Sequence, residues 1–315
     1  MAATQATQAR VVALRFDGDA LVVLDQTLLP WRERYLRLTD AEQVADAIRR
    51  LAVRGAPMIG VAAAYAMALD PRPELLKAAR PTAVNLARAV DRVAAAPDPI
   101  AEARAIHAEE EAASDAIAVH GADFLADADA RRILTHCNTG ALAAPGRGTA
   151  LAVIAELAVR GRLERVMATE SRPLLQGARL TVYELAKLNI PHELVVDSAA
   201  PGLIARGAVD VVIVGCDRVA ANGDVANKVG TYGLALAARA AGIPFVVAGP
   251  TSTIDAATPT GADITIEERD PDEVRSAGGQ PLTLPGTPTR NPAFDVTPAA
   301  LITALVTERG VAPTP

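Results

Sequence analysis

Two residues with reactive side chains follow apolar runs that are typical of buried strands. Cys137 comes directly after RILTH (132–136), and Asp217 comes shortly after VDVVIVG (209–215). A thiol can act as a nucleophile or proton carrier, and a carboxyl group shielded from water can act as a general acid. Each residue also has an ordinary interpretation, because a cysteine after a strand is often a buried filler and an aspartate is often a turn residue.

From residue 131 onward the chain alternates short apolar runs with helical patterns, which predicts a parallel sheet covered by helices on both faces. Ligands bind beyond the carboxyl ends of the strands in such sheets, so we expect Cys137 and Asp217 at one edge. The expected strands span residues 132–136, 165–170, 193–197, 209–215, 243–249 and 262–268. Helices are expected from about 147, from 173, up to 206, from 225, and after Thr297 in the tail.

The first part of the chain is predicted to be mainly helical. Three short strands are expected between residues 10 and 38, and helices over 40–53, from about 58, over 80–96 and over 99–125. We therefore predict an α/β protein in which an α-rich N-terminal domain with a small β-strand region (1–128) precedes a doubly wound domain (129–315).

Several polar turns before expected helices are suited to anion binding. Gly223, Asn227 and Lys228 are expected at the start of the helix from 225, where free N–H groups favour a phosphate. The turn Arg54-Gly55-Ala56-Pro57 offers a guanidinium and a close backbone approach, and Arg80 stands just before another helix.

Gln176 and Arg179 share a face near the start of the helix expected from 173, where an anion would also be favoured. A thiol, a strand-end carboxylate and these anion sites together describe an enzyme for a small phosphorylated metabolite that needs no cofactor.

A dinucleotide-binding site is an alternative interpretation of the sequence, and we reject it. The pair of glycines at 146–148 comes well after its strand, and Leu151 stands where the third glycine belongs.

The composition agrees with a small-molecule partner. The 315 residues have a net charge of −6 that is spread along the chain, which disfavours nucleic acid. The uncharged stretches stop short of the roughly 18–20 residues of a membrane span, and the start has no signal-peptide pattern, so we expect a cytoplasmic protein without a membrane partner. Cys137 and Cys216 are the only cysteines and lack zinc-site spacing, so no metal is expected.

Seven segments in order resemble the successive motifs of the 5-methylthioribose-1-phosphate isomerases. They are RGAPMIG (54–60), RPTAVNL (80–86), THCNTGALA (135–143), ESRPLLQGARLTVYEL (170–185), GCDRVAANGDVANKVGTYGLALAA (215–238), IEER (266–269) and NPAFDVTP (291–298). The wider family includes ribose-1,5-bisphosphate isomerases and regulatory subunits of the exchange factor of eukaryotic translation initiation. The resemblance implies a Rossmann-like C-terminal domain without a nucleotide, a homodimer and a place in methionine salvage.

The resemblance also assigns roles to residues. It places the catalytic cysteine on Cys137 and the catalytic aspartate on Asp217. The substrate contacts that it implies fall on Arg54, Gly55, Ala56, Arg80, Gln176, Asn227 and Lys228. Cys216 departs from the family pattern, in which we expect alanine.

The implied substrate is an aldose whose anomeric oxygen bears the phosphate, so an acid must protonate the ring oxygen before the ring can open. Asp217 can do so only if burial raises its pKa from about 3.9. Hydrogen then moves from C2 to C1, either as a proton through Cys137 or Asp217 or as a hydride. Ribose 1,5-bisphosphate and 5-deoxyribose 1-phosphate are alternative substrates. A non-catalytic regulatory subunit that binds sugar phosphates or nucleotides is a further alternative, which would be expected to lose both residues.

Overall fold

The structure is a computed structural model that describes residues 11–312. It begins with an antiparallel sheet of β1 (Leu14–Phe16), β2 (Leu21–Leu24) and β3 (Tyr35–Leu38), as expected. Helix α1 (Ala41–Arg49) follows, and its first turn is capped by Asp40, whose carboxylate accepts from the Gln43 N–H.

Helix α2 (Ala56–Leu69) is buried nearly all round, which fits its sequence without charged residues. The helix expected over 80–96 is shorter than predicted and forms α4 (Val84–Ala94), while α3 (Pro73–Ala79) was not predicted. Arg80 between the two helices is extended, with φ −151° and ψ 82°. The physical reason is Pro81, which disfavours helical geometry in the residue before it.

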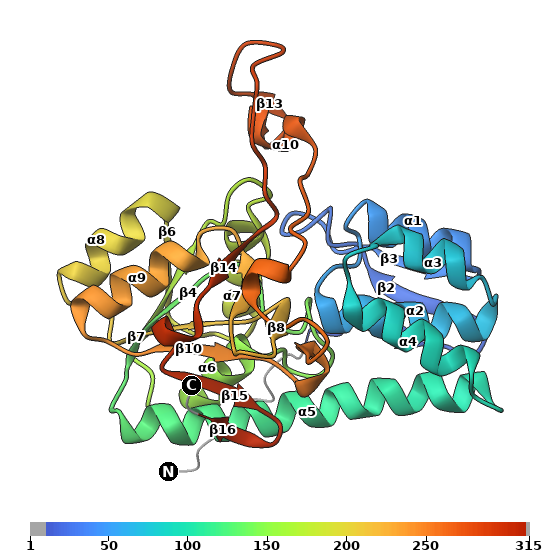
Figure 1. Ribbon diagram of the computed structural model, residues 1–315, viewed down its shortest axis with the longest axis horizontal. Helices are drawn as coiled ribbons and strands as arrows, with labels where there is room; N and C mark the ends of the chain where they lie inside the picture. Colours follow the sequence, from blue (N-terminus) through green and yellow to red (C-terminus); the bar gives the residue numbers. More distant parts are fainter. Residues whose placement is uncertain (1–10, 313–315) are drawn as a thin grey trace.

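Helix α5 (Pro99–Asp127) is the longest helix described and runs along the whole molecule (Figure 1). Ala103 and Ile106 in its first half belong to the hydrophobic core of α1 to α4. Ile117 and Leu125 in its second half belong to the core beneath the large sheet. One helix therefore contributes to both cores, and the domain boundary between residues 128 and 129 stays a prediction.

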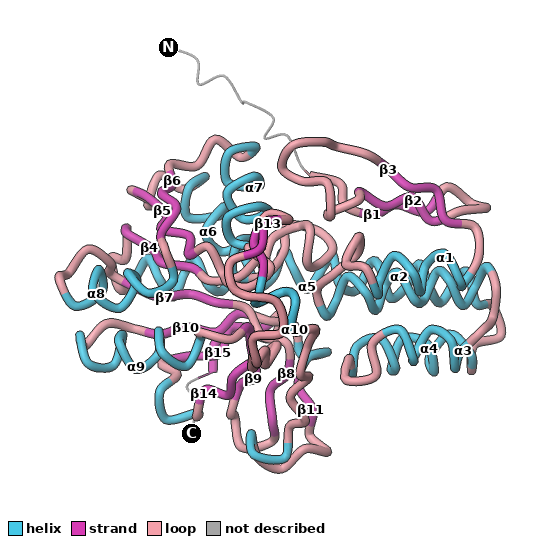
Figure 2. Tube along the Cα trace, turned by 90° about the horizontal axis from the view of Figure 1, so that it is seen from above, coloured by secondary structure: helices cyan, strands magenta, loops and turns pink. Residues whose placement is uncertain are grey.

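The large sheet has the order β16-β15-β10-β7-β4-β5-β6, and only β16 runs antiparallel to its neighbour. Figure 2 shows the strands from β15 to β6 side by side in this order. Its strands are β4 (Arg132–Thr135), β5 (Arg165–Thr169), β6 (His192–Val195), β7 (Val211–Val214), β10 (Phe245–Ala248), β15 (Ala304–Thr307) and β16 (Gly310–Ala312). The predicted α/β class with a parallel sheet is confirmed.

Helices cover both faces of this sheet. They are the second half of α5, α6 (Ala150–Val159), a π-helical turn (Gly177–Thr181) that continues as α7 (Val182–Lys187), α8 (Ala200–Ala205) and α9 (Thr231–Ala241). Alternate residues of each strand point to opposite faces. In β7, for example, Val211 and Ile213 pack in the core with α5, α6 and α7, while Val212 and Val214 pack in the core with α8 and α9.

The helix expected from 225 exists as α9 (Thr231–Ala241), but its predicted start was wrong. Residues there form β9 (Val225–Lys228), which pairs antiparallel with β8 (Arg218–Ala220) and with β14 (Phe294–Thr297). The dipeptide Asn222-Gly223 closes the turn between β8 and β9, and Gly223 takes the positive φ of 85° that such a turn favours. Helix α9 begins only after Gly230.

Two other expectations failed near the C-terminus. The tail helix after Thr297 is a single 3₁₀ turn followed by β15, because the apolar run at 304–307 pairs with β10 instead. The strand expected over 262–268 is largely irregular, with a 3₁₀ turn (Gly261–Asp263) and one isolated bridge between Glu268 and Pro292. Short apolar runs fit a strand or a helix equally well until their partners are known.

Residues 270–290 form an arm that projects from the body (Figure 1). It contains α10 (Pro271–Arg275) and a small hairpin of β12 (Ser276–Ala277) and β13 (Gln280–Pro281). A short strand, β11 (Ile254–Asp255), pairs with β8. Within residues 11–312 no helix is long and apolar enough to cross a membrane.

Candidate active site

A cavity of about 320 Å³ lies beyond the carboxyl ends of β4 and β7, where the sequence places its reactive residues. All the residues to which the resemblance assigns a role line it: Arg54, Gly55, Ala56, Arg80, Cys137, Gln176, Asp217, Asn227 and Lys228. The structure therefore brings these residues together, whereas their roles stay predictions.

Gly55 allows the chain to enter the cavity wall. Its φ is 96°, and a Cβ atom at this position would lie 2.2 Å from the backbone oxygen of Ala143. Only glycine fits such an approach without a shift of the backbone. This close packing fixes the backbone at the start of α2, and it thereby sets the direction of the neighbouring Arg54 side chain.

Cys137 follows β4 with a positive φ of 66°, a backbone geometry that is uncommon for a residue with a side chain. Its N–H donates to the Ser171 hydroxyl across 2.8 Å, and its carbonyl accepts from the Thr181 hydroxyl. The sulfur accepts from Gln176 Nε2 at 3.3 Å and lies 3.8 Å from Arg54 Nη2. Four contacts thus hold the thiol at one point of the cavity wall.

Asp217 follows β7 and retains some accessible surface because it faces the cavity. Desolvation nevertheless raises the pKa of its carboxyl group above the ordinary value. The charges of Lys228, Arg54 and Arg80 oppose this rise, and Glu267 supports it. Burial has the largest effect, so the carboxyl group holds its proton to a higher pH than an exposed aspartate does.

Lys228 and Asn227 reach the cavity from β9 and not from a helix start, so the predicted helix-terminus anion site is wrong. Gly223 lies in the hairpin turn and is not among the cavity residues. Lys228 Nζ donates to the Ala293 carbonyl across 2.8 Å, and desolvation lowers its pKa. Asn227 Nδ2 donates to the Thr231 hydroxyl across 3.0 Å.

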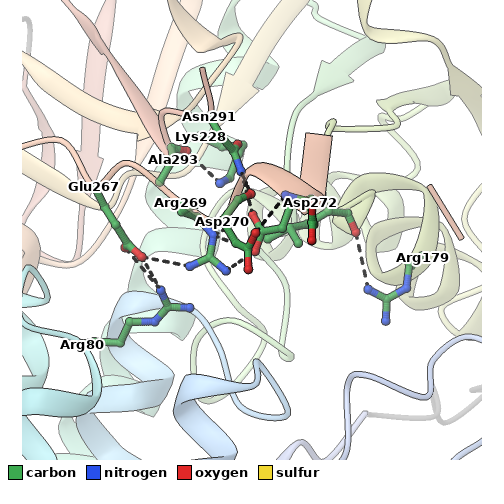
Figure 3. A network of polar contacts seen from close by, with 11 residues as sticks. Arg80, Arg179, Lys228, Glu267, Arg269, Asp270, Asp272, Asn291 and Ala293 are labelled. Carbon is green, nitrogen blue, oxygen red and sulfur yellow. Dashed lines mark hydrogen bonds and ion pairs between the residues drawn. The ribbon is translucent and has the colours of Figure 1, made fainter. Parts of the chain in front are cut away.

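Sequence reasoning missed three charged residues of the cavity wall, namely Arg50, Glu267 and Arg269. Glu267 Oε1 lies 3.0 Å from both Arg80 Nη1 and Arg269 Nη1, so one carboxylate holds two guanidinium groups together (Figure 3). Arg269 also pairs with Glu273 at the base of the arm. The only sequence signal was the charged segment IEER, which follows no regular strand.

Cys216 also lines the cavity, but its surroundings differ from those of Cys137. Its sulfur lies 3.3 Å from the Thr253 hydroxyl and packs against the core of α8 and α9. Burial raises the pKa of this thiol to about 12. A thiol that stays protonated at neutral pH is a poor nucleophile, which disfavours Cys216 as the reactive cysteine.

Among residues 11–312, no group of three or more histidine, cysteine, aspartate or glutamate side chains has an arrangement that could hold a metal ion.

Arg179, which was expected to share a face with Gln176, does line the same cavity. It donates to the backbone oxygens of Gln26, Thr27 and Leu29, so its guanidinium ties the strand region to the cavity wall.

Residues 52–314 match the Initiation factor 2 subunit family. A methylthioribose-1-phosphate isomerase of Anaeromyxobacter sp. (strain K) is 55% identical over 94% of this chain and 92% of its own. The corresponding protein of Parasynechococcus marenigrum (strain WH8102) is 49% identical over 95% and 93%.

Two solved structures are similar over nearly their whole length. The 5-methylthioribose 1-phosphate isomerase from Pyrococcus horikoshii OT3 has a TM-score of 0.89 at 38% identity and covers 97% of this chain and 93% of its own. The translation initiation factor eIF-2B, subunit delta, from A. fulgidus has a TM-score of 0.84 at 36% identity and covers 97% and 96%. The chain therefore belongs to the Initiation factor 2 subunit family.

Proposed function

We propose that this protein is an aldose–ketose isomerase that converts 5-methylthioribose 1-phosphate into 5-methylthioribulose 1-phosphate in methionine salvage. The observation that carries the proposal is the meeting of Cys137 and a high-pKa Asp217 in one cavity with cationic walls. The names of relatives at 49% and 55% identity support the same reaction. A homodimer and a cytoplasmic location remain predictions from the sequence.

The charges of the cavity suit one phosphate group. Its walls carry two acidic side chains, Asp217 and Glu267, and a larger set of basic ones, namely Arg50, Arg54, Arg80, Arg179, Lys228 and Arg269. A dianionic phosphate is held best by such guanidinium and ammonium groups. The volume of about 320 Å³ is also at the lower end of the range for small-molecule sites, which fits a pentose phosphate.

The surroundings favour an apolar group at C5 over a second phosphate. Arg80 and Arg269 are already paired with Glu267, and Arg179 is engaged with backbone oxygens. A second phosphate would therefore have to displace existing partners. The same cavity has apolar walls that could contact a methylthio group, formed by Ile59, Leu174, Leu180 and Phe294. We keep ribose 1,5-bisphosphate and 5-deoxyribose 1-phosphate as the alternative substrates.

Asp217 is proposed as the general acid. Its carboxyl proton passes to the ring oxygen as the bond from C1 to that oxygen breaks, which leaves an electron-poor C1 beside the phosphate ester oxygen. The Asp217 carboxylate formed in this step can then accept the proton of the C2 hydroxyl. A carboxyl group with a raised pKa is suited to both steps near neutral pH.

The hydrogen on C2 can reach C1 by two routes. In the hydride route, the C2 hydrogen moves to C1 with its electron pair as the C2 hydroxyl becomes a carbonyl. In the proton route, Cys137 or Asp217 removes the C2 hydrogen as a proton, an enediol-like state forms, and a proton is added at C1. Exchange of solvent deuterium into C1 of the product would favour the proton route.

A turnover assay tests the function. Purified protein is supplied separately with 5-methylthioribose 1-phosphate, ribose 1,5-bisphosphate and 5-deoxyribose 1-phosphate, and ketose formation is followed for each. We expect the highest kcat/KM with the first, and Asp217→Asn should lose about 10²–10⁴-fold in kcat with little change in substrate binding. If no sugar phosphate is converted, the regulatory-subunit alternative replaces the isomerase.

A further inference from the structure

Glu184 is a buried acidic residue that the proposed chemistry does not use. It lies on α7 and is 2% exposed. Its carboxylate accepts from Asn138 Nδ2 at 2.7 Å and from the backbone N–H groups of Ala141 and Leu142. Within residues 11–312 no lysine or arginine forms an ion pair with it. A buried carboxylate without a direct cationic partner costs free energy of folding, so we expect its position to serve a function.

The surrounding contacts show what the carboxylate does to Asn138. An ionised carboxylate can only accept hydrogen bonds, and a guanidinium can only donate them. Asn138 lies between the two: its Nδ2 faces Glu184 and its Oδ1 accepts from Arg54 Nη1 at 2.7 Å. The amide cannot turn over without placing its donor against Arg54 and its acceptor against Glu184. Both ends therefore fix one orientation of the Asn138 side chain.

Asn138 in turn aligns Arg54 with the cysteine. The second guanidinium nitrogen of Arg54, Nη2, donates to the backbone carbonyl of Asn138 at 3.1 Å and lies 3.8 Å from Cys137 Sγ. Three acceptors therefore define the plane of the guanidinium: the side-chain oxygen of Asn138, its backbone oxygen and the sulfur of Cys137. A continuous series of polar contacts thus leads from Glu184 through Asn138 and Arg54 to the sulfur.

The local backbone supports this arrangement. Gln176, Thr181 and Glu184 lie at or beside the π-helical turn that precedes α7, and all three reach Cys137 or Asn138. π-Helical turns occur frequently at functional sites because they change which side chains share a face. Gly140 leaves space for the carboxylate, since a Cβ atom there would lie 2.3 Å from Glu184 Oε2.

We propose that Glu184 is a positioning residue that holds Arg54 against Cys137 by fixing the orientation of the Asn138 amide. Its negative charge is needed because the three groups that hydrogen-bond to it, Asn138 Nδ2 and the N–H groups of Ala141 and Leu142, are all donors. Desolvation raises the pKa of Glu184 to about 7, so the arrangement is complete only when the carboxylate is ionised. Tests are therefore made at pH 8.

A pair of exchanged side chains gives a sharp test. Glu184→Gln places an amide N–H₂ among donors, and Asn138→Asp places an acceptor against the Glu184 carboxylate. In the double variant the glutamine donates to the new aspartate, which still accepts from Arg54. Each donor in the series from residue 184 to Arg54 therefore faces an acceptor again. A role confined to the backbone N–H groups of Ala141 and Leu142 would give no such rescue.

We expect each single variant to lose at least about tenfold in kcat with 5-methylthioribose 1-phosphate, with KM changed by less than about threefold. The double variant should recover at least about fivefold over the weaker single variant. Glu110→Gln is the matched control, because Glu110 is also a poorly exposed glutamate of raised pKa but contacts Ser252, outside the cavity walls. Its kcat should be unchanged.

A second readout separates this inference from the proposed function on which its activity test rests. Iodoacetamide alkylation of Cys137 and Cys216 is measured by peptide mass spectrometry on each folded variant. Without a correctly placed Arg54, Cys137 should react several-fold more slowly, while Cys216 serves as the internal reference. The double variant should regain the faster rate even if the protein proves not to be an isomerase.

Two results would overturn the inference. In the first, Glu184→Gln keeps both kcat and the Cys137 alkylation rate within about twofold of the unmodified protein. In the second, both single variants are impaired but the double variant is no better than the weaker of them. If Glu184→Gln does not fold, Asn138→Asp and the double variant still decide the matter, because the inference predicts that adding Glu184→Gln improves both the kcat and the Cys137 alkylation rate of Asn138→Asp.

Discussion

Gln176 donates a hydrogen bond from Nε2 to the sulfur of Cys137 across 3.3 Å, and its Oε1 is buried without a partner among the residues described. An unsatisfied buried acceptor in a cavity wall is costly unless a ligand completes it. The side chain thus contacts the thiol, and we propose that its oxygen accepts a hydrogen bond from a ligand in the cavity.

The first prediction concerns this side chain. Gln176→Leu removes the donor to Cys137 and the acceptor for the substrate, so kcat/KM should fall by about tenfold or more. Thermal stability should change little, because the variant also removes the unsatisfied oxygen. Steady-state kinetics and a thermal melt check both expectations. An unchanged kcat/KM would exclude Gln176 from substrate contact.

The second prediction distinguishes the two cysteines. Cys137→Ser should reduce kcat by at least about 10²-fold, whereas Cys216→Ser should retain most of the activity, because burial keeps the Cys216 thiol protonated. The comparison uses the same substrate and pH for both variants. Inactivation by the change at Cys216 alone would show that the wrong sulfur has been assigned.

The third prediction concerns the backbone of the cavity wall. Gly55→Ala forces a side chain into a positive-φ position and against the Ala143 carbonyl, so it should cost at least about 2 kcal/mol and lower Tm by several degrees. Gly233→Ala is the matched control. A Cβ atom at Gly233 meets nothing within 4 Å, and alanine favours α9. Similar melting temperatures for the two variants would contradict this account of Gly55.

The fourth prediction is a pH-dependent stability at Glu110. Burial raises the pKa of Glu110 to about 7, although Ser252 donates a hydrogen bond to it. Because the pKa is higher in the folded state than its ordinary value of 4.5, the carboxyl group favours folding at low pH and loses this contribution as pH rises through about 7.

Glu110→Gln removes that dependence. We expect the variant to be more stable than the unmodified protein at pH 8 by up to about 3 kcal/mol and to differ little at pH 4.5. Urea unfolding at the two pH values measures the difference. A stability gain of the same size at both would mean that the charge of Glu110 is not its source.

The sequence allowed the position of Cys137 and Asp217 to be predicted because strand ends in a parallel sheet meet at one edge. It failed for the segment after Asp217. The Asn222-Gly223 turn is a hairpin signal, yet the apolar residues of β9 also fit the first turn of a helix. Pairing with β14, which comes from much later in the chain, selects the strand.

Glu184 and Glu267 could not be singled out in the same way. A glutamate on a short helix ordinarily faces water, and nothing nearby in the sequence of α7 indicates that Glu184 is buried against the loop after β4. Glu267 lies in an irregular segment, and its partner Arg80 is 187 positions away. Such contacts depend on the packing of distant elements, which periodicity does not record.

The protonation state of Asp217 tests the central claim most directly. Infrared difference spectra between the unmodified protein and Asp217→Asn isolate the signal of this one carboxyl group as pH is varied. The general-acid role requires a protonated-carboxyl band near neutral pH, and burial raises the pKa of Asp217 in that direction. A spectrum with only the ionised carboxylate from pH 5 upward would contradict the role of Asp217 as the general acid.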